Sequence, residues 1–404
     1  MRRREILKGV AVASVLPLLP QAAAAKPIAS KGLVRRVRPS DRGWPTLDEW
    51  AALKRQVGGN LIPVSFPINV LKTAPHSAAA RQITKEIRNP FYIADQPGLT
   101  ETLGWVDAWV TRPSVYAVVA RNANHIAAAV NFARNHGLRL VVKGRGNSYV
   151  GASNAPDSLM IWTRPMTDIQ MHAAFIPQGC EGKCAPQPAI TMDAGTYWLQ
   201  AYQAVTTHGG RYVQGGGCTT VGIAGLILGG GFGSFSKRYG TAAGSLLEAE
   251  VVTADGKIRT ANACTHPDLF WALKGGGGGT FAAVSKVTVR THELPEYFGI
   301  VSFKVKAPSD EAYRMLLREF VGFLRRASRQ RALGGAGARA RRQRAQNQNA
   351  LAGTGRRAVA ENLAAVPRLG EEIPARIFHD GAARDRKSAR ATHVGCGVAR
   401  GELA

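Results

Sequence analysis

The segment that most constrains this chain is GGGCTTVGIAGLILGGGFG, residues 215–233, in which nine of 19 residues are glycine. Glycine loses more backbone freedom on folding than any other residue, so a packed domain accumulates it only where the backbone must approach something closely. A second glycine-rich segment, KGRGNSYVGAS, spans residues 143–153. Inward-turned N–H groups of such loops form anion-binding concavities. The pair predicts a site for a diphosphate within a long cofactor.

Each glycine-rich segment follows a pattern of strand, helix and strand. Residues 113–120 and 138–142 are apolar strand-like runs, and between them residues 125–137 have helical periodicity and a terminal glycine. A second set, with strands at 188–195 and 211–214 around a helix at 197–210, leads into residues 215–233. We therefore expect two β-α-β units. Downstream we expect a hairpin, a short helix, two strands and an amphipathic helix, at 246–261, 267–279, 281–294, 297–307 and 309–323.

Two common nucleotide-binding patterns do not match. The segment LKGGGGGT, residues 273–280, places its lysine before the glycines, whereas a Walker A loop needs Gly-Lys-Ser/Thr at its end. The segments GRGNSYVG and GGGFGS lack the Rossmann spacing of G-x-G-x-x-G. A different kind of nucleotide site is required.

The two loops, together with GTAAGSLLEAEVVTADGKI and HPDLFWALKGGGGGTFAAVSKVTV, resemble the berberine-bridge-enzyme-like flavoproteins. These belong to the superfamily of vanillyl-alcohol oxidase and p-cresol methylhydroxylase (PCMH). The likeness covers residues 113–294 and implies an α+β fold, with FAD bound between two α/β subdomains and an antiparallel-sheet substrate domain following. It implies FAD contacts from Gly144, Arg145, Gly146, Asn147, Ser148, Tyr149, Gly151, Gly217, Cys218, Thr219, Thr220, Val221, Gly222, Ile223, Ala224, Gly225, Gly229, Gly230, Gly231, Gly233, Val251 and Val252.

Four positions bear on how the flavin is held. Cys218 matches the position that forms a 6-S-cysteinyl bond to the isoalloxazine in many members of the family, although a small buried cysteine is the alternative. Asn147 stands at the family's histidine, which excludes an 8α-histidyl bond. Arg145 replaces a glycine and either crowds the loop or pairs with a phosphate oxygen. Ile223 stands where, by resemblance, valine favours reaction with oxygen and bulkier residues block it, so dehydrogenase behaviour is expected.

The two ends of the chain differ in character from its middle. Residues 1–25 combine basic residues, with Arg3-Arg4 as in twin-arginine signals, a short apolar run and small residues, so they predict a signal peptide and periplasmic or secreted location. An ordinary secretory signal is the alternative. Residues 324–404 are rich in Arg, Ala and Gly, and Phe378 is their only aromatic residue. They predict a basic tail without packed structure, which is either natural or the product of a shifted reading frame.

The resulting domain organisation has five parts: a signal peptide at 1–25, an N-terminal extension at 26–105, a PCMH-type FAD-binding domain at 106–295, the start of an incomplete substrate domain at 296–323, and the tail at 324–404. The resemblance's C-terminal Asn-Tyr motif and its base residues have no counterpart, so no catalytic residue is assigned. We expect no membrane span in the mature chain.

The charge distribution and the cysteines bear on whether the chain binds nucleic acid or a metal ion. The net charge of +26 is not confined to one face, and much of it lies after Phe323, which disfavours nucleic-acid binding. The five cysteines are odd in number for an exported chain. Cys180 and Cys184 are expected to form a loop disulfide or to remain thiols, rather than to bind metal.

These features together predict an FAD-dependent oxidoreductase. Hydride would pass from a small alcohol or sugar-like substrate to flavin N5, with an electron acceptor that the sequence does not identify. The alternatives are an inactive flavin-binding remnant of a disrupted gene and a basic, non-enzymatic binding protein.

Overall fold

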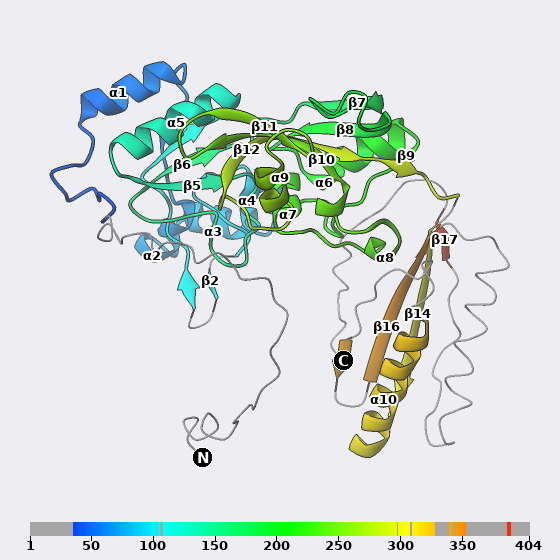
Figure 1. Ribbon diagram of the computed structural model, residues 1–404. Coiled ribbons are helices and arrows are strands. Elements are labelled where there is room, and N and C mark those ends of the chain that lie inside the picture. Colours follow the sequence, from blue (N-terminus) through cyan, green and yellow to red (C-terminus); the bar gives the residue numbers. More distant parts are fainter. Residues whose placement is uncertain are drawn as a thin grey trace, which may run out of the picture. The chain divides into compact units, whose positions relative to one another are not determined.

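The computed structural model describes residues 35–102, 104–105, 108–296, 298–307, 309–327, 339–341, 344–352 and 386–388 (Figure 1). Its mixture of helices and sheets has the predicted α+β character. The predicted signal peptide at 1–25 lies outside the described residues. None of the helices in the described part of the chain is long and apolar enough to cross a membrane.

The first sheet carries the first glycine-rich loop. Its strand order is β1-β4-β6-β5, with bounds Leu61–Pro63, Tyr116–Val119, Ser158–Trp162 and Arg139–Lys143. Strands β4 and β5 both run parallel to β6, whereas β1 pairs antiparallel with β4. The predicted first β-α-β unit is confirmed, with β6 inserted between its two strands. Parallel strands end at the same edge of a sheet, so β5 delivers the loop to that edge.

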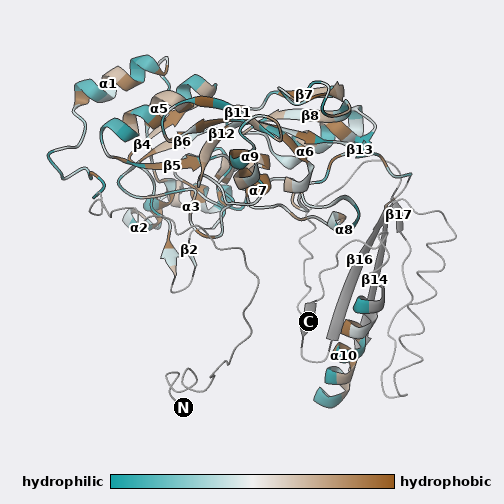
Figure 2. Cartoon of the chain, in the orientation of Figure 1, coloured by the Kyte–Doolittle hydropathy of each residue, from teal (hydrophilic) through white to brown (hydrophobic). Residues whose placement is uncertain are grey.

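Helix α5, Ala123–Asn135, connects β4 to β5. Asn122 caps its first turn by accepting a hydrogen bond from the backbone of His125, and Gly137 follows its end with a φ of 62°. The helix packs in one hydrophobic cluster with the first sheet and with Val252 and Ala283 of the second sheet. In Figure 2 strands such as β5 and β12 are largely coloured as hydrophobic, as expected for strands covered on their faces.

The N-terminal stretch belongs to this first subdomain, which differs from the predicted boundary at residue 106. Helix α1, Leu47–Gln56, begins with a capping box formed by Thr46 and Glu49 and buries Trp50 and Leu53. These side chains join the cluster around α5. The remaining N-terminal elements are short, which is why hydrophobic periodicity did not reveal them: η2 (Pro67–Asn69), α2 (Val70–Thr73), α3 (Ala78–Glu86), α4 (Pro90–Ala94), β2 (Gly104–Trp105) and β3 (Trp109–Val110).

The second sheet is antiparallel, with strand order β11-β10-β12-β8-β7 and bounds Ile258–Asn262, Leu246–Thr253, Ala282–Arg290, Gln187–Asp193 and Ile169–Phe175. The predicted hairpin is β10 with β11. The predicted second β-α-β unit is wrong in its pairing: the strand after the helix, β9 (Arg211–Tyr212), pairs with β13 (His292–Glu293) instead of joining β8. Strand β9 has only two residues and ends where the glycine-rich loop begins.

The helices of this half are short. They are α6 (Trp198–Tyr202), which continues as the π-helix η3 (Gln203–His208), α7 (Ile223–Leu228), α8 (Ser236–Tyr239), η4 (Ala243–Ser245) and α9 (Pro267–Leu273). A second hydrophobic cluster gathers the inner faces of α6, α7 and the sheet around the fully buried Trp198.

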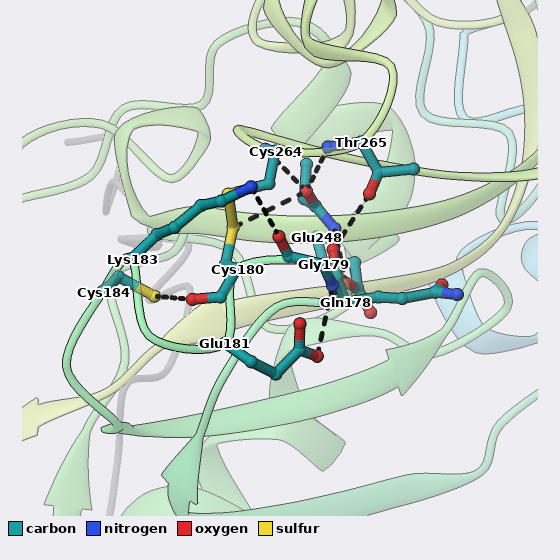
Figure 3. Close-up of a disulfide and its surroundings, with 10 residues drawn as sticks. Gln178, Gly179, Cys180, Glu181, Lys183, Cys184, Glu248, Cys264 and Thr265 are labelled. Atoms are coloured by element: carbon teal, nitrogen blue, oxygen red, sulfur yellow. Dashed lines mark hydrogen bonds between the residues drawn. A yellow bond between two sulfur atoms is a disulfide. The ribbon is translucent and has the colours of Figure 1, made fainter.

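A disulfide joins Cys180 to Cys264, 84 residues apart in sequence, with Cα atoms 5.5 Å apart (Figure 3). The expectation of a Cys180–Cys184 disulfide is therefore wrong, and Cys184 is an exposed thiol. The segment before Cys180 is held against the turn after β11, because Asn262 Nδ2 and Thr265 Oγ1 both donate to the carbonyl of Gln178, each at 2.9 Å. Sequence spacing does not reveal such a long-range contact.

A further antiparallel sheet, with strand order β15-β16-β14-β17, follows the second sheet in sequence. Its bounds are Arg339–Arg341, Arg344–Ala352, Phe298–Lys306 and Arg386–Ser388, and helix α10 spans Asp310–Ala327. At these residues after Phe323 the backbone forms paired strands, which the sequence did not predict. Backbone pairing to β14 does not depend on aromatic side chains. The rest of the predicted tail lies outside the described residues.

Candidate functional site

Lys143, the last residue of β5, anchors the start of the first loop. Its side chain is 1% exposed. The ammonium donates to three backbone carbonyl groups in one turn, those of Gln96 (2.8 Å), Pro97 (2.9 Å) and Leu99. Burial lowers the pKa of Lys143 to about 7, whereas three carbonyl acceptors favour the protonated form. With all three donors used, Lys143 holds the preceding segment in place and does not face a ligand.

Two side chains of the first loop connect it to the second loop. Arg145 Nε donates to the carbonyl of Thr220 at 2.7 Å, and the backbone N–H of Gly222 donates to Asn147 Oδ1 at 3.4 Å. A Cβ at Gly222 would lie 3.5 Å from Arg145 Cβ, so the two loops are in contact there. The structure therefore brings together the two segments that the sequence singled out, although the contacting residues lie 75 or more positions apart.

Five of the nine glycines of the second loop form two contrasting groups. At Gly215, Gly231 and Gly233 an added Cβ would come within 2.4 Å of protein atoms, so internal packing requires glycine there. At Gly217 and Gly225 a Cβ would meet nothing within 4 Å, and both residues are exposed. Close packing of the first group holds the loop, while the second group leaves its backbone open to a ligand.

Cys218 lies at the open part of this loop, beside Gly217. It is a partly exposed thiol. Tyr202 of α6 lies behind the loop and donates its hydroxyl to the carbonyl of Gly216 at 2.6 Å. Burial, and then proximity to Cys218, raise the pKa of the Tyr202 hydroxyl. This tyrosine keeps its proton at neutral pH and fixes the backbone before Cys218.

Some of the predicted contact residues have their side chains in the protein interior. Ile223 is fully buried within the cluster around Trp198, so its side chain faces the core and not the open surface of the loop. Val251 and Val252 are also buried, in different hydrophobic clusters. These three can reach a ligand only through their backbone. The other predicted residues of the two loops lie on or next to the two contacting segments.

Sequence reasoning missed three residues around the first loop, because they lie far from it in the chain. Phe91 and Tyr197 present their rings to the Arg145 guanidinium, with its central carbon 5.6 and 4.2 Å from the ring centroids. Glu101 has a buried Oε1 with no hydrogen-bond donor among the described residues. Burial raises the pKa of the Glu101 carboxyl, while Arg145 and a hydrogen bond from Asn147 lower it. No local pattern marks any of the three.

A group of titratable aromatic residues gathers around Tyr212, which precedes the second loop, and Tyr239, which follows it. The Tyr212 and Tyr239 rings lie 4.5 Å apart, and Tyr239 lies 4.8 Å from the His292 ring. Burial, and then the positive charges of Arg290 and Arg211, lower the pKa of His292. The imidazole is neutral at pH 7, with a buried Nε2 that has no partner among the described residues.

The site meets the requirements of a dinucleotide cofactor. It has open glycine backbone at Gly217 and Gly225, a partly exposed thiol in the second loop, and buried guanidinium donors at Arg145 without an acceptor in the described part of the chain. The family described as "FAD binding domain" matches residues 114–262, which contain both loops. Residues 114–262 therefore contain an FAD-binding domain.

Individual relatives agree with this family. An FAD-linked oxidoreductase of Arthroderma benhamiae is 32% identical over 321 residues, covering 75% of this chain and 56% of that protein. The crystal structure of the VAO-type flavoprotein MtVAO615 from Myceliophthora thermophila C1 superposes with a TM-score of 0.76 at 27% identity, covering 88% of this chain and 66% of that one. Glucooligosaccharide oxidase from Acremonium strictum shares the fold, with a TM-score of 0.55 at 22% identity over 68% of this chain and 54% of that one.

The chain spans about half the length of the curated relatives it matches, from 46% of an FAD-linked oxidoreductase of Epichloe festucae var. lolii to 56% of the Arthroderma benhamiae protein. The matched part contains the cofactor domain.

Proposed function

We propose that this protein is an FAD-dependent oxidoreductase that oxidises a small alcohol or sugar-like substrate and holds its flavin through Cys218. Bound FAD would accept the substrate's hydride at flavin N5, while the hydroxyl proton leaves to a base. The observation that carries the proposal is the contact between the two loops, of which the second has open glycine backbone and a thiol and the first has buried cationic donors.

The residues of the chain would act by position and charge. Lys143 and Tyr202 fix the backbone at the start of each loop, and Asn147 holds the loops together through Gly222. Asn147 has no nucleophilic nitrogen comparable to imidazole, so attachment would involve Cys218 alone. Glucooligosaccharide oxidase carries both a 6-S-cysteinyl and an 8α-N1-histidyl link in its FAD. The bond proposed here corresponds to the first of these.

Covalent attachment has a direct test. Purified protein precipitated with acid should retain yellow flavin in the pellet, and Cys218→Ala should release it into the supernatant. Cys184→Ala, which removes an exposed thiol far from the loops in sequence, is the matched control and should retain it. Covalent flavin in Cys218→Ala would contradict the proposal.

Flavin binding without turnover is the second candidate. The change of composition after Phe323 favours it, because residues 324–404 contain one aromatic residue with which to build a substrate pocket. Anaerobic mixing with primary alcohols and sugars separates the two: bleaching of the flavin absorbance supports oxidation, and unchanged absorbance with every substrate supports binding alone.

Export stays a prediction. The Cys180–Cys264 disulfide is compatible with it, because disulfides persist in oxidising compartments.

A further inference from the structure

Arg145 is a residue of the first loop and is 2% exposed. Three residues outside that loop contact its side chain. Its Nε donates to the Thr220 carbonyl at 2.7 Å, and its guanidinium lies over the rings of Tyr197 and Phe91. The two terminal nitrogens, Nη1 and Nη2, are buried and have no hydrogen-bond acceptor among the described residues. The orientation of the group is therefore fixed, and its strongest donor pair is unused.

A buried cation with unused donors is costly unless an anion meets it. Burial, followed by the charge of Arg164, lowers the pKa of Arg145 to about 10, so the group remains charged at neutral pH. Two carboxylates lie nearby. Asp95 is taken by Arg164, with 2.7 Å between Arg164 Nε and Asp95 Oδ1. Glu101 attracts the guanidinium electrostatically, but its buried Oε1 has no hydrogen-bond donor in the described part of the chain.

We propose that Nη1 and Nη2 of Arg145 bind the diphosphate of FAD, a ligand contact made by a side chain at a position where the resemblance expects glycine. A guanidinium presents two parallel donors that match two phosphate oxygens, and its planar shape suits stacking against Tyr197. The contact between Arg145 and the Thr220–Gly222 segment places these donors where the two loops meet. The inference rests on the proposed binding of FAD.

The test compares ligands that contain the diphosphate with one that lacks it. In flavin-free protein carrying Cys218→Ala, dissociation constants are measured for FAD, ADP and riboflavin by flavin fluorescence and calorimetry. Arg145→Gln should weaken FAD and ADP at least tenfold and leave riboflavin within about twofold. Arg164→Gln is the matched control, because it removes a guanidinium that lies over the same Tyr197 ring but is paired with Asp95. It should change FAD affinity by less than threefold.

Equal weakening of riboflavin and FAD by Arg145→Gln, or unchanged ADP affinity, would overturn the inference. If Arg145→Gln does not fold, Arg145→Lys takes its place. Lysine keeps the charge but lacks the two parallel N–H donors of the guanidinium, so ADP affinity should still fall severalfold. Unchanged ADP affinity in Arg145→Lys would overturn the inference. If Glu101, and not a phosphate group, is the partner of the Arg145 guanidinium, Glu101→Gln and Arg145→Gln should both lower stability and neither should alter ADP binding. That result would also overturn the inference. Failure of the unsubstituted site to bind FAD, ADP or riboflavin would overturn the proposed function as well.

Discussion

The two glycine-rich loops meet at one site but are held in place by different means. The first loop depends on long buried side chains, since Lys143 and Arg145 reach backbone carbonyl groups in other segments. The second depends on close packing at Gly215, Gly231 and Gly233, where an added Cβ would meet the Trp198 ring, the Leu226 side chain and the Gly215 carbonyl oxygen, respectively. Glycine content alone is therefore a poor guide to how a loop is fixed: part of it serves packing, and part leaves space for a ligand.

The largest expected loss of stability comes from adding a side chain at Gly233, the most tightly packed glycine of the second loop. In Gly233→Ala the new Cβ would lie 2.0 Å from the Gly215 carbonyl oxygen, so the backbone must separate. We expect a loss of about 4 kcal/mol or more in the free energy of unfolding, because overpacking against backbone cannot relax by a change of rotamer. Urea denaturation followed by circular dichroism measures it.

Gly217→Ala is the matched control in the same loop, since its Cβ would meet nothing within 4 Å. Its stability should stay within about 0.5 kcal/mol of wild type, as for ordinary surface substitutions, while FAD affinity falls. Similar destabilisation by the two substitutions would remove the distinction between packing glycines and open glycines.

In the first loop, the stability of the protein should depend on the buried side chain of Lys143 and not on a glycine. Lys143→Met keeps the length of the side chain but leaves three buried carbonyl oxygens without their donor. A loss of about 3 kcal/mol is expected, since each unsatisfied buried group costs about 1–3 kcal/mol and water can reach some of them. Thermal and urea unfolding at pH 7 provide the measurement.

The difference in stability between wild type and Lys143→Met should also depend on pH. The pKa of Lys143 is lowered to about 7 in the folded protein, so between pH 7 and 9 the unfolded chain binds more protons at this residue. Wild type should therefore gain stability relative to Lys143→Met as pH rises over this range, by up to about 3 kcal/mol. A constant difference between the two proteins would show that the three carbonyl groups keep the ammonium protonated.

The smallest effect is expected at Ile223, in the second loop's helix. Its side chain is fully buried in the core around Trp198, so Ile223→Val should cost about 1 kcal/mol through a small cavity. Because the side chain faces the core, the rate at which oxygen reoxidises the reduced flavin should change less than twofold in stopped-flow mixing. A large acceleration in Ile223→Val would mean that the Ile223 side chain lies beside the flavin. It would then support the prediction, made from the sequence, that this residue blocks the reaction with oxygen.

The sequence by itself determined the elements whose signal is local. The helix at Ala123–Asn135, the hairpin of β10 and β11 and the long strand β12 follow from hydrophobic periodicity and turn residues. The two loops and Cys218 were recognisable because glycine and cysteine are costly to accumulate without a use. These features indicated an FAD-binding domain before any contact was known.

Only the tertiary structure decided which distant segments meet. The pairing of Cys180 with Cys264, and the contact of Arg145 with Thr220, join residues 84 and 75 positions apart. Packing also decided that Ile223 faces the core. Local propensity carries no information about such contacts, because they depend on how sheets and helices bury their apolar faces against one another. The unused donors of Arg145 became visible only once that burial was in place.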